Sequence, residues 1–206
     1  RKLEENLARM VGVITKLLDH DILPWLEKGR RPTDEERHRA STIVADRRCG
    51  ALTDPIIRNA QERRQLEVIE KFLRKRGYKK QQLAPGKPLE EMQPGTFCFR
   101  LNVAVGDASR SLNIPIDVVI QPFQPRPGQL PILIEAKSAG DFTNTNKRRK
   151  EEATKIHQLR ATCGDEVQYV LFLCGYFDSG YLGYEAAEGI DWIWEHRIED
   201  MKQLGV

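Results

Sequence analysis

The chain has 206 residues, of which 40% are hydrophobic and 31% are charged. This composition excludes an intrinsically disordered chain and an integral membrane protein, and the length suits one large domain or a core domain with a small addition. The formal net charge of +3 is too small to establish a polyanionic partner by itself.

The apolar run 169–177 is too short to cross a bilayer, and no charged segment precedes an apolar one at the amino end. We therefore expect a cytoplasmic protein with no membrane partner. The cysteines are scattered and include no Cys-x-x-Cys pair, and the histidines are isolated, so neither residue type indicates a zinc site or disulfide framework.

The amino-terminal part of the sequence predicts two helices. Apolar residues recur at steps of three and four from Leu3 to Leu18, which is the spacing of one helix face, and Pro24 ends this first helix. A second helix is expected from Thr33, whose hydroxyl can cap it while Glu36 completes a capping box, to about Arg48.

A third helix is predicted from Asp54, as the capping residue, to about Arg76. Pro55 would take the first helical position, where its missing N–H costs no hydrogen bond, and Gly77 would follow the last turn. We place a domain boundary before this helix: residues 1–52 form a helical appendage for dimerisation or for clasping DNA, and residues 53–206 form the core.

The rest of the chain predicts an α/β core. Runs rich in Val, Ile and Phe indicate strands over 97–105, 111–121, 130–137 and 167–175. The first three should form an antiparallel meander, a basic helix should cover about 146–161, and the tail from Tyr184 reads as helical. The expected order is helix, three strands, helix and strand around a mixed sheet flanked by helices.

Three polar residues on these strands indicate a catalytic site. Glu135 and Lys137 lie two apart on one strand, so their side chains project to the same face. Asp117 interrupts the apolar strand before it, and neighbouring strands of a meander would bring it beside Glu135. A chance pattern with an edge-strand ion pair is the competing interpretation.

Two carboxylates are suitable ligands for Mg²⁺, which keeps several waters for the phosphate of a substrate. We expect Asp117, Glu135 and Ala136 to hold the ion, which would polarise a scissile phosphate and activate a water. Lys137 would orient that water and offset charge on the phosphoryl oxygens.

Glu62 is the fourth candidate catalytic residue. It falls within the apolar stripe of the third predicted helix, where a carboxylate is costly unless it is paired or bound to metal. Glu62 would then be an accessory ligand or base. The alternatives are an ion pair with Arg63 or Arg64, or fraying of the helix at its start.

The segment after Lys137 is the candidate DNA-binding strip. Asparagine and arginine side chains can read base edges, and lysine and arginine neutralise phosphates, although a solvated helix surface would carry the same charges. The candidate DNA-binding residues are Ser138, Asn144, Asn146, Lys147, Arg148, Arg149 and Lys150.

This order of elements, with an acid in the second strand and Glu-x-Lys closing the third, resembles the PD-(D/E)xK nuclease superfamily over about residues 54–175. The segments 58–65, 113–120, 133–152 and 174–185 are similar to type II restriction endonucleases of the XamI family. One departure is that Ile116 separates Pro115 from Asp117.

The resemblance implies a restriction-endonuclease-like fold in which Asp117, Glu135 and Lys137 form the catalytic triad. It also implies Mg²⁺-dependent cleavage of double-stranded DNA at a short palindrome, such as a site like GTCGAC, with 5′-phosphate ends. A palindrome in turn implies a two-fold symmetric homodimer.

Three alternatives remain open on the sequence. A structure-selective repair or junction-resolving nuclease would share the fold and the ligands. A DNA-binding module without catalysis would bind with a steep salt dependence and no turnover. A helical partner-docking protein would explain residues 1–52 but leave the acidic residues of the strands without a role.

Overall fold

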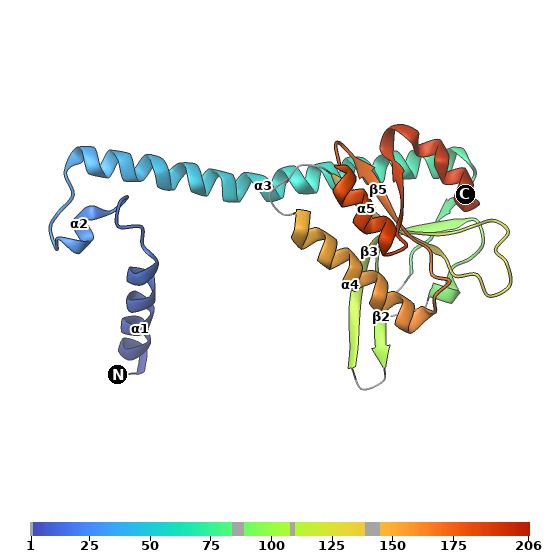
Figure 1. Ribbon diagram of the computed structural model, residues 1–206, viewed down its shortest axis with the longest axis horizontal. Coiled ribbons are helices and arrows are strands. Elements are labelled where there is room, and N and C mark those ends of the chain that lie inside the picture. The colour runs from blue at the N-terminus through green and yellow to red at the C-terminus, as the bar shows by residue number, and fades with distance from the viewer. Residues whose placement is uncertain (1, 84–88, 108–109, 139–144) are drawn as a thin grey trace. The chain divides into compact units, whose positions relative to one another are not determined.

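The computed structural model describes residues 2–83, 89–107, 110–138 and 145–206 (Figure 1). The chain divides into two compact units, residues 1–57 and 58–206, and the boundary falls within one long helix. Across the described ranges, no helix combines the length and the apolar character that spanning a membrane requires.

The first unit contains α1 (Lys2–Leu17), α2 (Pro24–Glu27) and the beginning of α3 (Asp34–Lys75). The predicted capping box at the start of α3 is confirmed. The Glu36 N–H donates to the Thr33 hydroxyl at 3.2 Å, and the Thr33 N–H donates to the Glu36 carboxylate at 2.9 Å. Each side chain thus satisfies a main-chain donor that the helix leaves free.

The predicted helix start at Asp54 is wrong, because α3 runs without interruption through Pro55 to Lys75. Proline removes one main-chain hydrogen bond and crowds the preceding turn, at a cost of about 3 kcal/mol in a helix interior. The long runs of helix on both sides of Pro55 outweigh that local preference. The predicted end is correct within one residue, and Gly77 follows it with φ +89°.

The second unit is built on one six-stranded sheet in the order β1-β2-β3-β4-β5-β6. Its strands are β1 (Lys79–Lys80), β2 (Thr96–Asp107), β3 (Arg110–Gln121), β4 (Ile132–Ser138), β5 (Tyr169–Cys174) and β6 (Asp191–Trp194). Its helices beyond α3 are η1 (Leu89–Glu91), α4 (Thr145–Cys163), α5 (Ser179–Ala187) and η3 (Glu195–Leu204).

The predicted antiparallel meander is confirmed in β2, β3 and β4, and β5 joins β4 in parallel after the basic helix α4. The αβββαβ order and the α/β class are therefore correct. The helical prediction for the tail missed β6, a four-residue strand that pairs in parallel with β5. A four-residue strand is too short to show a period, so its two tryptophans gave no signal that distinguishes it from a helix.

Helices cover both faces of the sheet. One face packs on the second half of α3 and on η3 through Leu66, Ile69, Phe72, Leu73 and Met201. The other packs on α4 and α5, which lie side by side in Figure 1, through Ile156, Leu159 and Tyr181. Burial of these apolar faces against the sheet is the main stabilisation of the fold.

The side chains of the β2–β3 hairpin change the face of the sheet on which they pack at Arg100 and Asp117, which the strand register skips between Phe99–Val118 and Leu101–Ile116. Phe99 packs on the α3 side of the sheet, whereas Leu101 packs on the α4 side, although strict alternation would place both on one face. Arg100 has φ +53°, and it is the one residue other than glycine in the described ranges with positive φ. Asp117 therefore lies where the hairpin turns away from the sheet.

Candidate active site

The candidate site lies where β3 and β4 stop pairing. Their register ends at Val118 opposite Ile134. Asp117 directly precedes Val118 and Glu135 directly follows Ile134, so both acidic residues lie just beyond the last pair. Beyond that point the Ala136 N–H donates to the Asp117 carboxylate at 2.8 Å, in place of a strand carbonyl. The separation of the two strands opens a gap that their acidic side chains enter.

A cleft of about 250 Å³ occupies this gap. The structure brings six of the predicted site residues together here, namely Asp117, Glu135, Ala136, Lys137, Ser138 and Glu62. The remaining residues that line the cleft are Arg58, Gln65 and Glu151. The cleft is thus formed by β3, β4, the second half of α3 and the amino-terminal part of α4, all within the second unit.

Glu135 and Lys137 belong to a chain of ion pairs inside the cleft. The Glu135 Oε1 atom lies 3.0 Å from the Lys137 ammonium and 2.6 Å from the Lys155 ammonium. The Lys137 ammonium also lies 2.7 Å from Glu152, whose other oxygen accepts a hydrogen bond from the Tyr169 hydroxyl. Ion pairs thus connect β4 with α4, and a hydrogen bond from a neutral hydroxyl connects α4 with β5.

The charges of the site favour a bound cation. Burial, and then the neighbouring Glu135 carboxylate, raise the pKa of Asp117 to about 6. Burial alone would lower the pKa of Lys137, but the Glu135 and Glu152 carboxylates outweigh it and raise that pKa above its usual value. Lys137 is accordingly a charged ammonium, and a cation beside Asp117 and Glu135 would relieve their mutual repulsion.

The donors that remain free fit a hard divalent cation. The Glu135 Oε2 atom is buried and has no hydrogen-bond partner, while both lysines lie on Oε1. No group of three or more His, Cys, Asp or Glu side chains in the described ranges could hold a metal ion. A site here would rest on two carboxylates, main-chain oxygen and water, which is the donor set that Mg²⁺ accepts.

Glu62 lies at the margin of the cleft rather than in the core. Its side chain is 33% exposed and lies 2.9 Å from the Arg100 guanidinium. Glu62 is thus paired with an arginine, but with Arg100 of β2 instead of Arg63 or Arg64, and Arg64 pairs with Glu195. The negative charge of Glu62 nevertheless reaches Asp117 and contributes to its raised pKa.

The predicted DNA-binding strip is described only in part. Asn144 lies outside the described residues, and Asn146, Lys147 and Arg148 belong to the first turn of α4. The Ser138 hydroxyl donates to the Gln61 side chain at 2.9 Å. Their contact with DNA stays a prediction.

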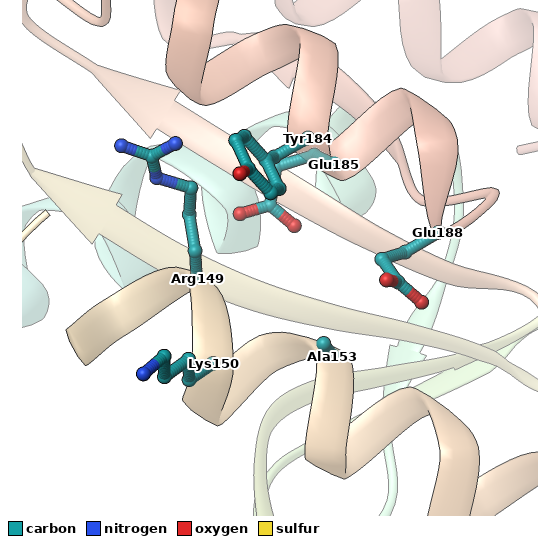
Figure 2. Close-up of a pocket in the computed structure, with 6 residues that line it drawn as sticks. All are labelled: Arg149, Lys150, Ala153, Tyr184, Glu185 and Glu188. Atoms are coloured by element: carbon teal, nitrogen blue, oxygen red, sulfur yellow. The ribbon is translucent and has the colours of Figure 1, made fainter. Parts of the chain in front are cut away.

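Arg149 and Lys150 line a different cavity, of about 390 Å³, between α4 and α5. Figure 2 shows the Arg149 side chain extended beside the Tyr184 ring, with the Glu185 carboxylate beneath that ring. The Arg149 guanidinium carbon lies 4.5 Å from the centre of the ring. Arg149 and Lys150 therefore line this cavity and not the carboxylate cleft.

Three residues of the site were missed on the sequence. Gln65 is buried and donates to the main-chain carbonyls of Lys137 and Phe172 at 3.2 Å each, which joins α3 to the sheet. Glu152 follows the charged residues for which a solvated surface was the alternative, yet it is fully buried. Lys155, one turn later, reaches Glu135. A signal was present, because Glu152 precedes the buried Ile156 by one helical turn.

Comparisons with known proteins agree with the resemblance. The family model of the XamI restriction endonuclease matches residues 1–194. The chain is 60% identical over 203 residues to the type II restriction enzyme SalI of Streptomyces albus G, covering 98% of this chain and 64% of that protein. It is 26% identical over 161 residues to the type II restriction enzyme XamI of Xanthomonas campestris pv. amaranthicola, covering 74% of this chain and 52% of that protein.

Among solved structures, protein VC1899 from Vibrio cholerae aligns with 56% of this chain and 28% of its own at a TM-score of 0.37 and 17% identity, a likeness too slight to support an argument. The chain spans roughly half to two thirds of the length of the two curated relatives. The family match covers nearly the whole sequence, and the relative at 60% identity agrees with it. The chain belongs to the XamI restriction endonuclease family.

Proposed function

We propose that the protein is a type II restriction endonuclease that hydrolyses phosphodiester bonds in both strands of DNA at a short palindrome. It would require Mg²⁺ and leave 5′-phosphate ends. The observation that carries this proposal is the shared cleft of Asp117, Glu135 and Lys137. Membership of a family whose matched relatives are named type II restriction enzymes supports the same activity.

The chain's own residues would divide the reaction between them. Asp117, Glu135 and the main-chain oxygen of Ala136 would hold Mg²⁺, with Glu62 accessory to them. When bound, the ion would polarise the scissile phosphate and lower the pKa of a bound water. The Lys137 ammonium, held beside Glu135, would orient the attacking water and offset negative charge that develops on the phosphoryl oxygens.

A second cleft supports a path for DNA past these carboxylates. It measures about 560 Å³ and shares Glu62 and Asp117 with the first cleft. The other side chains that line it include Asn59, Arg63, Arg100 and Asn102. In the part of the chain that the structure describes, no ion pair joins Arg58 or Arg63 to a carboxylate, so both charges are available to DNA phosphates.

The test is digestion of a plasmid of known sequence in Mg²⁺, followed by mapping of the ends. We expect discrete fragments that share one recognition sequence and carry 5′-phosphates. The Glu135→Ala variant should cut no DNA yet bind it in Ca²⁺, because the carboxylate is needed for catalysis rather than for DNA affinity. Glu67→Ala, which changes an exposed glutamate of α3, should cut like the unmodified protein.

Undiminished cutting by Glu135→Ala would overturn the assignment of the site. Nicks that follow DNA structure instead of sequence would favour a repair or junction-resolving nuclease of the same fold. Salt-sensitive binding with no turnover in any divalent metal would leave a DNA-binding module.

A further inference from the structure

Glu152 is a fully buried acidic residue on the face of α4 that packs against the sheet. Ile156 and Leu159, one and two turns later, are fully buried on the same face. A carboxylate at such a position is strongly disfavoured unless charged and polar partners replace its water. The contacts of Glu152 therefore identify the groups that stabilise its buried carboxylate.

Both carboxylate oxygens of Glu152 have partners from the sheet. Oε1 lies 2.7 Å from the Lys137 ammonium of β4, and Oε2 accepts a hydrogen bond from the Tyr169 hydroxyl of β5. Burial would raise the pKa of Glu152, but Lys137 and Lys155 outweigh it and lower that pKa, so the group is ionised. The carboxylate is thus fixed from one side by Tyr169 and presents its charge to Lys137.

Lys137 is held between two carboxylates as a result. Its ammonium lies 3.0 Å from Glu135 and 2.7 Å from Glu152, and only 17% of its side chain is exposed. A lysine ammonium is a compact charge on a flexible four-carbon chain, so a single ion pair leaves the position of the ammonium loosely defined. The second carboxylate, from a different element, restricts the ammonium to the edge of the cleft.

We propose that Glu152 is a positioning residue for DNA cleavage, which holds the Lys137 ammonium at the place where it acts beside Asp117 and Glu135. This inference rests on the proposed nuclease function. Tyr169 supports it by fixing the Glu152 carboxylate. Glu152 lines neither of the two clefts that contain Asp117, so it would act through Lys137 rather than on the substrate.

The test is a single-turnover measurement in which Mg²⁺ is added to a preformed complex of the intact protein with DNA that carries its mapped site. Glu152→Gln preserves the size of the side chain and removes its charge. We expect the rate constant of cleavage to fall 10- to 100-fold, the usual loss when a group that orients an active-site residue is removed. DNA affinity in Ca²⁺ should remain within twofold.

Rate constant and amplitude separate a positioning role from a structural one. A variant that merely misfolds in part would lower the fraction of DNA cut while the surviving molecules cut at the original rate constant. Glu185→Gln is the matched control, because Glu185 is an equally buried glutamate on α5 with no ion pair to Lys137 in the described residues. Its rate constant should change by less than twofold.

The outcomes are decisive in each case. Cleavage by Glu152→Gln at the original rate constant overturns the inference, while the unmodified protein still cuts. An unmodified protein that cuts no DNA defeats the proposed function instead. Should Glu152→Gln fail to fold, Tyr169→Phe decides: a lower rate constant at full amplitude supports positioning, and an unchanged one overturns it.

Discussion

Glu185 is a buried glutamate of α5 whose ionisation opposes folding. Burial, and then the negative charge of Glu152, raise its pKa to about 7 in the folded chain, well above the usual range of a glutamate. Because the folded protein holds this proton more tightly than the unfolded chain, the resulting stabilisation is present at acidic pH. It is lost as the pH rises through about 7.

We predict that Glu185→Gln raises the melting temperature at pH 8 but not at pH 5. A neutral amide avoids the cost of a buried charge, which we take as roughly 1–2 kcal/mol, or about 2–8 °C for a chain of this size. Thermal unfolding of both proteins between pH 5 and pH 9 measures the difference. A difference that is constant across this range would contradict the assigned ionisation.

At the level of residues, the sequence predicted the side chains that line the cleft but not the buried Glu152 that pairs with Lys137. The alternation of a strand places Glu135 and Lys137 on one face, and the order of the strands brings Asp117 to them, so these three could be found. Glu152 was harder, because consecutive charges at 147–152 resemble a solvated surface. The helical period is the one signal: Glu152 lies four residues before the apolar Ile156 and therefore on the same buried face of the helix, unlike the charged residues beside it.

At the level of elements, Pro55 is a residue whose local preference for a helix start did not determine the structure. The pair Asp54-Pro55 is a good helix start, yet α3 continues through it. Residues 50–60 are all exposed, so the helical runs on both sides of Pro55, and not tertiary packing, carry the helix through it. β6 was missed because four residues show no period, although pairing with β5 fixes it as a strand.

Pro55→Ala tests whether α3 is one helix. In a continuous helix the new N–H can donate to the carbonyl four residues earlier, so hydrogen exchange of the amides at 51–59 should slow by at least tenfold. In two separate helices, Pro55 would lie at a first position that needs no donor, and exchange would not slow. Amide exchange followed by mass spectrometry distinguishes these results.

The arginines of α3 provide a test of the DNA path. We predict that Arg58→Ala and Arg63→Ala each weaken DNA binding in Ca²⁺ and reduce the dependence of log affinity on log salt by about one, as expected for one lost phosphate contact. Arg74→Ala is the matched control, since Arg74 lies on the same helix but pairs with Glu70 at 2.8 Å. Equal effects of all three substitutions would show only a general role of charge.

At the level of the whole molecule, α1 is a helix of the first unit whose apolar side chains are exposed. None of its residues is buried, and five apolar side chains repeat at alternating steps of four and three. These are Leu3, Leu7, Met10, Ile14 and Leu17, each at least half exposed. This spacing is the seam of a coiled coil, which suits the expected homodimer.

We predict that the double substitution Leu7→Glu and Ile14→Glu converts the dimer into a monomer, because two charges would then face each other across the seam. Ala8→Glu adds a charge to the same helix away from the seam and should leave the dimer intact. Sedimentation equilibrium measures the molecular mass of each protein. A mass unchanged by the double substitution would exclude this role for α1, and the predicted boundary at residue 52 would lose its functional meaning.

We expect Asp117 and Glu135 together to bind the divalent cation that supports cleavage. Crystals of the DNA complex grown with Mn²⁺ in place of Mg²⁺ would locate this cation by anomalous diffraction. We predict a peak roughly 2–2.3 Å from one carboxylate oxygen of each residue, beside a DNA phosphate. A Mn²⁺ peak elsewhere near the DNA, with none between these two carboxylates at saturating metal, would contradict it.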